Sequence, residues 1–232
     1  IIITTPLSLY LALLQILGGR NLNNVKGDVF LNGQQFNRRM RRQIAFVPQE
    51  ETYLPSPYLT ISDYLMFSAM CRFEDSVLYE DREFAVNRML EMLNLRGVKD
   101  TPVMKCSGGE RKRCSIGIEL LIQNPSLLLI DEGSSGLDSA AALQLVRNVK
   151  KIALTSNLPI LMSLHQPATQ IFMMFDRVMF LSAGEMVYSG FPQSLMYTLN
   201  NLGFSSIDDN MAPSDLLISL LSFDNKSTEV DF

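Results

Sequence analysis

The sequence predicts an α/β fold with a mostly parallel sheet, an antiparallel β piece and an inserted α-helical subdomain. Three observations lead to this fold class. Short apolar runs, each typical of a buried strand, occur at 29–31, 44–47, 127–130, 160–164 and 178–181. Patterns with helical spacing lie between several of these runs, and strand–helix–strand alternation is typical of a parallel sheet. The stretch 58–123 contains no such run, so we predict helices there.

The N-terminal residues 1–17 are strongly apolar and begin the predicted core. No basic residue precedes them, Pro6 interrupts them, and a membrane span needs about 20 residues. We therefore predict a buried strand followed by a buried helix that begins near Ser8, whose hydroxyl can cap it. Because the first residue is Ile, we expect the sequence to be a piece of a longer protein.

Capping signals and apolar spacing place the remaining elements. The antiparallel piece is expected around 29–31, and Thr60 with Asp63 resembles a capping box that opens a helix through Cys71. Residues 83–95 and 139–154 have the spacing of one helix face. The runs at 127–130 and 160–164 are continuous enough to predict interior strands of the sheet.

Composition excludes several classes of function. The 232 residues carry 20 Lys+Arg against 24 Asp+Glu, a net charge of −4, which disfavours binding to nucleic acid by bulk charge. The one basic cluster, at 38–42, lacks interleaved aromatic residues, so we interpret it as a solvated face. Three cysteines without a CxxC pair and a single His exclude a zinc site. The charged fraction of 19% also disfavours disorder.

Two acids follow the apolar run at 127–130. Asp131 and Glu132 would lie at the carboxyl edge of a parallel sheet, where ligands bind in this architecture. Burying two carboxylates is costly unless a cation or a substrate uses them. An apolar run followed by Asp-Glu matches the Walker B pattern, in which Asp131 would help to hold Mg²⁺ and Glu132 would polarise a water. The other interpretation is a strand that ends in a polar turn.

A second signal is CSGGERKR at 106–113. Ser107 with Glu110 forms a predicted capping box, so a helix should begin here and continue toward Leu121. Gly108 and Gly109 leave the backbone N–H groups of the first turn uncovered, and the helix dipole adds positive potential. This is the chemistry of an anion site, although an ordinary capped helix would carry the same signal.

Four segments in order carry a resemblance to a known family. VPQEE (47–51), the signature-like segment 106–121, LLLIDEGSSGLDS (127–139) and SLHQP (163–167) resemble the Q-loop, signature, Walker B with D-loop, and H-loop of ABC transporter nucleotide-binding domains. The ERKR extension, the HQP triplet, FDRVMFLSAGEMVYSG (175–190) and APSDLLISLLS (212–222) resemble the G (White) subfamily. The resemblance covers nearly the whole chain and implies a P-loop NTPase-like fold.

The resemblance also implies roles for individual residues. Gln49 would reach Mg²⁺ and sense a transmembrane part, and His165 would be the switch residue near the γ-phosphate. Asp131 and Glu132 would take the Walker B roles. ATP bound to the opposite domain of a dimer would be contacted by the signature residues Ser107, Gly108, Gly109 and Glu110. The D-loop that crosses the dimer interface would be Ser135, Gly136, Leu137 and Asp138.

One motif of the family departs from its pattern. Counting back from the Leu17–Arg20 segment, GxxxxGK[ST] should occupy 4–11, which read TTPLSLYL. Tyr10 stands where Lys is expected and Leu11 where Ser or Thr is expected. Without the glycines and the lysine, the backbone nest and the local cation for a triphosphate are lost. Gly133-Ser134 also replaces the Pro-Thr that usually follows the Walker B Glu.

Three functions follow as hypotheses. The leading one is a White-type transport subunit with a degenerate site of its own, in which ATP and Mg²⁺ are bound by the partner's Walker A and this chain donates its signature in trans. The second is a fully active transporter ATPase whose P-loop was lost by truncation or a gene-model error, and the third is a non-hydrolysing scaffold. The partners would be a second nucleotide-binding domain, identical or different, and a transmembrane domain at the cytosolic face of a membrane.

The implied domain organisation has three parts. Residues 1–57 and 124–203 would form a RecA-like ATP-binding core, and 58–123 the helical signature subdomain. Residues 204–232 would form a C-terminal segment and linker toward a transmembrane domain.

Overall fold

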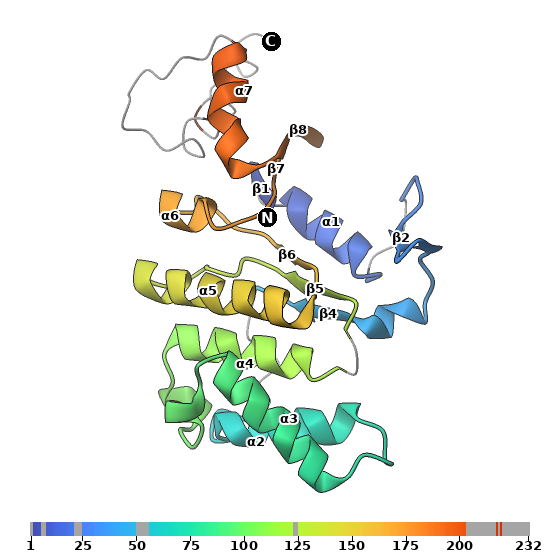
Figure 1. The fold of residues 1–232 in the computed structure, drawn as a ribbon, viewed down its shortest axis with the longest axis vertical. Coiled ribbons are helices and arrows are strands. Elements are labelled where there is room, and N and C mark those ends of the chain that lie inside the picture. Colours follow the sequence, from blue (N-terminus) through green and yellow to red (C-terminus); the bar gives the residue numbers. More distant parts are fainter. Residues whose placement is uncertain are drawn as a thin grey trace, which may run out of the picture. The chain divides into compact units, whose positions relative to one another are not determined.

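The computed structural model describes residues 2–5, 8–20, 25–49, 56–122, 125–202, 217 and 219, with the side chains of 2–5 and 8–10 left out. Two compact units divide the chain, one formed by 1–13 with 163–232 and the other by 14–162. Figure 1 shows both units, which we describe one at a time.

The first unit contains a three-stranded sheet of order β1-β7-β8. Strand β1 (Ile2–Thr5) pairs in parallel with β7 (Val178–Ser182), and β8 (Glu185–Gly190) returns antiparallel to β7. The turn between β7 and β8 uses Ala183 and Gly184, both at positive φ. Helices α6 (Thr169–Phe172) and α7 (Leu195–Asn201) and the short η4 (Pro192–Ser194) complete it.

Aromatic side chains form the core of this first unit. The Phe172 and Phe180 side chains are almost fully buried, with ring centroids 6.2 Å apart, and Tyr188 meets Phe180 edge-on at 6.3 Å. Leu195 of α7 is also fully buried.

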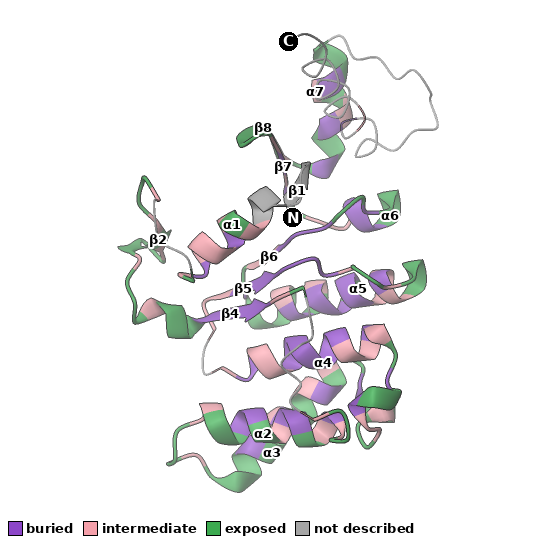
Figure 2. Ribbon diagram, turned by 180° about the vertical axis from the view of Figure 1, so that it is seen from behind, coloured by how far each residue is buried: buried purple, intermediate pink, exposed green. Residues whose placement is uncertain are grey.

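The second unit is built on the parallel sheet β4-β5-β6. Its strands are β4 (Ile44–Val47), β5 (Leu127–Ile130) and β6 (Ile160–Met162), with Val47 opposite Ile130 and Ile130 opposite Met162. All four residues of β4 are buried, as the purple strands of Figure 2 show. The prediction for 127–130 as an interior strand is confirmed, since β5 is the middle strand.

The interior position predicted for 160–164 is wrong within this sheet. Strand β6 ends at Met162 and is the outer strand of the three, and Ile160 and Leu161 are only half-buried. An apolar run reports that residues prefer burial, but it carries no information on strand order, which explains the error.

The helices of the second unit account for the long middle of the chain. They are α1 (Ser8–Leu17, shared with the first unit), α2 (Ile61–Arg72), α3 (Tyr79–Met92), α4 (Gly108–Leu120) and α5 (Ser139–Ser156), with the 3₁₀ turns η1 (Met40–Gln43), η2 (Arg96–Val98) and η3 (Val103–Lys105). Every described secondary-structure element between 58 and 122 is a helix. Helix α1 begins at Ser8 and α4 directly after Ser107, as predicted.

The antiparallel piece is a short hairpin of β2 (Phe30–Leu31) and β3 (Gln34–Gln35). Its two-residue turn is Asn32-Gly33, with φ of 52° and 76°. Both positive angles are those of the tight hairpin turn that Asn-Gly favours. The prediction of an antiparallel piece around 29–31 is therefore confirmed.

Buried arginine explains where α2 ends and α3 begins. The Arg82 guanidinium donates to the carbonyl oxygens of Ala69 and Met70 in the last turn of α2, at 3.4 and 3.1 Å, and to that of Glu74 at 2.7 Å. The Ala69 carbonyl already accepts from the Phe73 N–H at 3.1 Å, whereas the last carbonyls of a helix, such as that of Met70, have no partner within it, so Arg82 supplies one. Helix α3 begins at Tyr79, four residues before the predicted 83, because apolar spacing does not detect a first turn anchored by an arginine.

Candidate functional site

The carboxyl ends of β4 and β5 meet at one edge of the sheet. The Asp131 N–H donates to the Val47 carbonyl oxygen at 2.8 Å, which joins the residue after β5 to the last residue of β4. Asp131 and Glu132 are 2% and 5% exposed. Gln49 lies two residues beyond β4, and its Nε2 donates to Glu132 Oε2 at 2.6 Å. The structure therefore brings together three predicted site residues, Gln49, Asp131 and Glu132.

Glu132 adopts a backbone conformation that is uncommon for a residue with a side chain. Its φ is 42°, and non-glycine residues held in this region concentrate at functional sites. The next residue, Gly133, packs on β6, where an added Cβ would lie 2.9 Å from Met162 Sδ. A larger residue at 133 would therefore require the flexible Met162 side chain to shift.

The signature segment forms the capped start of α4. The Ser107 hydroxyl accepts from the Glu110 N–H at 3.3 Å, and Glu110 Oε2 accepts from the Ser107 N–H at 2.8 Å. This confirms the predicted capping box. The N–H groups of Gly108 and Gly109 have no acceptor within the helix, because they belong to its first turn. They are the donors that a helix N-terminus offers to an anion.

The predicted D-loop lies against this helix start. A Cβ added to Gly108 would lie 3.4 Å from Leu137 Cδ2 and 3.8 Å from the Gly136 carbonyl oxygen, and one added to Gly109 would lie 3.2 Å from the Ala141 Cβ. Asp138 caps α5 by accepting from the Ala141 N–H at 2.8 Å. Gly136 has a φ of 70°, which fits glycine at this turn. The signature and the 135–138 turn are thus one continuous surface.

His165 is exposed and follows β6 by three residues. It belongs to the segment 163–232 of the first unit, whereas the acids belong to the second. Within the second unit, the acid Glu132 is joined to Gln49 by the hydrogen bond given above.

Two buried cations on α4 were not among the predicted site residues. Lys112 is 3% exposed, and its Nζ donates to the carbonyl oxygens of Pro48, Gln49 and Asp131 at 3.0, 3.2 and 3.3 Å. Arg113 is 9% exposed, and its Nε has no hydrogen-bond partner among the described residues. Burial lowers the pKa of the Arg113 guanidinium, and the charge of Glu110 opposes this shift.

The sequence carries no periodic signal for these two cations. All six residues from 112 to 117 are buried, so burial extends around α4 and does not follow one helix face. Residue type alone assigns Lys and Arg to the solvent.

Cys106, directly before the signature, is a buried thiol rather than a nucleophile. Burial raises its pKa, the charge of Glu110 adds to the shift, and Arg111 opposes it. Its Sγ contacts the Pro102 carbonyl oxygen at 3.5 Å. A raised pKa keeps the thiol protonated near neutral pH, so it does not supply a thiolate.

The predicted phosphate slot lies at the start of the chain. Strand β1 ends at Thr5 and α1 begins at Ser8. Pro6 and Leu7 lie outside the described residues, as do the side chains of Ser8–Tyr10. Leu11, where a Ser or Thr was expected, lies within α1 and is half-buried.

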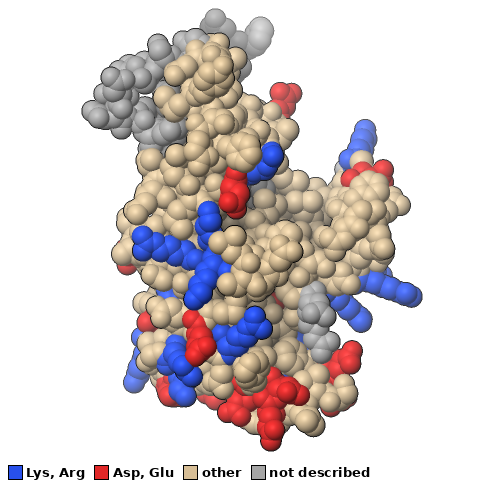
Figure 3. Space-filling view, in the orientation of Figure 1, with Lys and Arg blue, Asp and Glu red and all other residues tan. Residues whose placement is uncertain are grey.

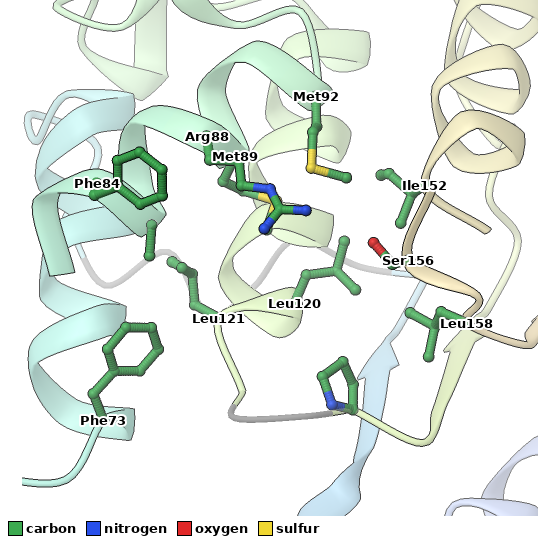
Figure 4. A pocket seen from close by; sticks show the side chains of 12 residues that line it. Phe73, Phe84, Arg88, Met89, Met92, Leu120, Leu121, Ile152, Ser156 and Leu158 are labelled. Carbon is green, nitrogen blue, oxygen red and sulfur yellow. The ribbon is translucent and has the colours of Figure 1, made fainter. Parts of the chain in front are cut away.

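An apolar cavity of about 470 Å³ lies away from these residues, at the other end of β5. Pro125, which precedes β5, and Leu158, which precedes β6, line it together with side chains of α3, α4 and α5. Figure 4 shows the Arg88 guanidinium directed into this cavity between Leu120 and Met92. The acids follow the opposite end of β5, so this cavity is separate from the candidate site.

The described surface is mixed in charge. Figure 3 shows acidic side chains gathered at the start of α3, whose first turn contains Glu80 and Asp81. None of the described helices has the length and apolar character that crossing a bilayer requires.

Comparison with known proteins places this geometry in a family. Residues 12–135 match the family model of the ABC transporter. The chain is 38% identical over 213 residues to "ABC transporter G family member 14" of Arabidopsis thaliana, covering 90% of this chain and 32% of that protein. It is 34% identical over 225 residues to "ATP-binding cassette sub-family G member 8" of Rattus norvegicus, covering 94% of this chain and 32% of that protein. The chain thus spans about a third of the length of these relatives.

Solved structures agree on the fold. The ATP-binding cassette MJ0796, in a dimeric post-hydrolysis state bound to ADP and Pi, superposes with a TM-score of 0.67 at 21% identity, over 81% of this chain and 82% of that one. A second dimeric structure of this cassette gives the same TM-score at 20% identity. These likenesses support the mostly parallel α/β fold with antiparallel pieces.

Proposed function

The chain belongs to the ABC transporter family, and from this premise we propose that it is the nucleotide-binding domain of a G-family-like membrane transporter. It would couple ATP binding and hydrolysis at a dimer interface to transport. In this proposal it is the partner with a degenerate cis site, and it donates its signature motif to the ATP held by a second nucleotide-binding domain.

The observation that carries the proposal is the start of α4. Ser107 and Glu110 cap each other, so the N–H groups of Gly108 and Gly109 are left for an external anion. A Cβ at Gly109 would lie 3.2 Å from the Ala141 Cβ, so glycine at this position lets the start of α4 pack closely on α5. These features fit a phosphate approaching from outside the chain, as the trans role requires.

The edge formed by β4 and β5 fits the cis half of the same proposal. Asp131 and Gln49 carry oxygen atoms of the kind that Mg²⁺ prefers as ligands. Glu132, which is hydrogen-bonded to Gln49, would orient water. Among the described residues, no group of three or more His, Cys, Asp or Glu could hold a metal alone. Phosphate oxygens would therefore have to complete the coordination shell.

Two features support a degenerate cis site. Only residues 6 and 7 separate β1 from α1, whereas a GxxxxGK[ST] loop needs a longer connection to wrap phosphates. Residues 4–11 contain neither Gly nor Lys, and the family match begins after them, at residue 12. The residues present at this slot do not fit a triphosphate.

The remaining roles extend the proposal to partners. His165 would act as the switch residue, and the turn of Ser135, Gly136, Leu137 and Asp138 would cross the interface to the second domain. Residues 1–57 and 124–203 would be the RecA-like core, 58–123 the signature subdomain and 204–232 the link to a transmembrane domain of the same chain or complex. The assembly would lie at the cytosolic face of a membrane.

The test compares the two halves of the site in the purified transporter complex. Glu132→Gln removes the cis carboxylate, and Ser107→Ala removes a group that serves the trans site. We expect ATP turnover to change by less than about twofold for the first variant and to fall by about 100-fold for the second.

Other outcomes select other functions. Equal loss from both variants would mean that the cis site hydrolyses ATP, which favours a fully active transporter with a P-loop supplied by sequence missing here. Absence of turnover in the wild-type complex would favour the scaffold.

A further inference from the structure

We propose that Lys112 is a positioning residue that holds the start of the Q-loop and the end of β5 to the signature helix, so that the three segments move together. The hydrogen bonds of Lys112 are part of the geometry of the second unit. Their effect on ATP turnover rests on the proposed function.

The contact consists of three hydrogen bonds to backbone carbonyl groups. An ammonium group has three donors, and Lys112 Nζ has three carbonyl oxygens within 3.0–3.3 Å, those of Pro48, Gln49 and Asp131. The side chain is only 3% exposed, so water cannot replace these partners at low cost. Loss of the amine would leave three buried carbonyl groups without this donor.

The three carbonyls belong to the segments that carry the candidate chemistry. Pro48 and Gln49 open the Q-loop, and Asp131 is the first Walker B acid. Lys112 lies four residues after Gly108, which is about one helical turn, so its stem follows any displacement of the signature glycines. A single side chain therefore joins residues of the cis half to the helix that serves the trans half.

A second set of contacts, made by Glu119, anchors the C-terminal end of α4. Glu119 Oε1 accepts from Arg72 Nη2 of α2 at 2.6 Å, and Glu119 Oε2 accepts from the Phe46 N–H of β4 at 3.4 Å. Helix α4 is thus anchored at two points, by Glu119 to β4 and by Lys112 to the residues that follow β4 and β5, and Lys112 is the anchor nearer the signature. With Glu119 holding one end, Lys112 determines how the N-terminal turn is placed relative to the Q-loop.

The consequence is a route between the two composite sites of the proposed dimer. A change at the Q-loop would displace the carbonyls of 48 and 49, and Lys112 would pass this displacement to Gly108 and Gly109. The partner's nucleotide would then meet a signature whose position depends on this chain's own Q-loop. Nothing in this route requires the degenerate cis slot to bind ATP.

The test compares Lys112→Met with a matched control, Lys105→Met, in the full-length chain within its complex. Met keeps the unbranched stem and removes the donors, whereas Lys105 is an exposed lysine on η3. Lys112→Arg is a third variant, because a planar fork cannot reproduce three converging donors. The first readout is hydrogen exchange without nucleotide, with the Asp131 amide as the reporter, since it bridges β5 to β4.

We expect Lys112→Met to speed exchange of the Asp131 amide about tenfold, the scale of one lost hydrogen bond to a charged donor, while amides of α2 change by less than about twofold. Lys112→Arg should not restore the wild-type rate, and Lys105→Met should match wild type. An unchanged Asp131 amide would overturn the proposal. An equal increase across α2 and α3 would also overturn it, because Lys112 would then only stabilise the whole unit.

The second readout is ATP turnover by the complex. Lys112→Met should lower kcat about tenfold and change KM less than about twofold, because the side chain positions the signature and does not touch nucleotide. A raised KM with wild-type kcat would contradict a positioning role. If the wild-type complex shows no turnover, the proposed function fails, and the exchange measurement still decides whether Lys112 joins these segments.

Discussion

Helices α2 and α4 begin in the same way and are used differently. Each starts with a capping box, Thr60 with Asp63 in α2 and Ser107 with Glu110 in α4. The residues that follow the cap separate them. The first turns of α2 contribute the fully buried Ile61 and Leu65, whereas α4 continues with two glycines.

The difference teaches that a cap alone does not mark a ligand site. In α2 the cap is followed by apolar anchors, and the Tyr64 hydroxyl accepts from the Ser56 N–H at 2.7 Å, so the helix start is built into the fold. In α4 the capping box satisfies the N–H groups of Ser107 and Glu110, and it leaves the N–H donors of the two glycines for an acceptor outside the helix. Variants of the two helices should therefore separate stability from activity.

The largest effect is expected from Gly108→Ala. A Cβ here meets Leu137 at 3.4 Å, an ordinary contact, so the fold accepts it and thermal stability should stay within about 1 °C of wild type. ATP turnover by the complex should fall about 100-fold, because the methyl group covers the donors proposed to meet phosphate.

The control for this variant is Gly97→Ala, which has no atom within 4 Å of the added Cβ and lies on η2. Turnover by Gly97→Ala should match wild type. Wild-type turnover by Gly108→Ala would remove the distinction between the two helices, since α4 would then be an ordinary capped helix.

The second prediction concerns Gly117 of α4, which packs against other helices and is not part of the proposed anion site. A Cβ on Gly117 would lie 2.9 Å from both Leu65 Cδ2 of α2 and Leu93 Cδ1, and these leucines are fully buried. Gly117→Ala should lower the free energy of unfolding by about 1–2 kcal/mol, since overpacking exceeds the gain in helix propensity. Denaturant titration of the full chain measures this change in the free energy of unfolding.

The comparison with Gly108→Ala sharpens this second prediction. Both variants add one methyl group to the same helix, but only Gly117 faces a filled core. A Gly117→Ala chain as stable as wild type would mean that Leu65 and Leu93 repack without cost.

The capping boxes show what could be predicted from sequence. Their signal lies within four residues, and both helix starts followed from it. The apolar runs likewise located β4 and β5, because a buried strand needs no partner information to be recognised. The Asn32-Gly33 turn also carried a local signal for its hairpin, which could have fixed β2 and β3 to the residue.

Other features depend on partners far along the chain. Arg82, Lys112 and Arg113 are buried because carbonyl groups or packing elsewhere accept them, and residue type alone assigns them to solvent. The outer position of β6 follows from strand order, which an apolar run does not encode. The pairing of Gln49 with Glu132 joins residues 83 positions apart, so only the resemblance to a family suggested that they share a site.

The smallest expected effect is at the cap of α2. Thr60→Ala should lower the free energy of unfolding by about 1 kcal/mol at neutral pH, the usual cost of losing a cap, and should leave ATP turnover unchanged. Thr155→Ala is the matched control, because the Thr155 hydroxyl donates to the Lys151 carbonyl oxygen within a helix, where its loss should cost less than about 0.5 kcal/mol.

This last effect should also depend on pH in a fixed direction. The hydroxyl and the backbone N–H of Thr60 lower the pKa of Asp63, against a small opposing effect of burial. A carboxyl group whose pKa is lower in the folded state stabilises the fold above its unfolded pKa of about 3.9, and this contribution is lost as pH falls through the folded pKa. The difference between wild type and Thr60→Ala should therefore be constant from pH 7 to about pH 5 and shrink below about pH 4. A difference that grew on acidification would show that the cap does not act through the ionised carboxylate of Asp63.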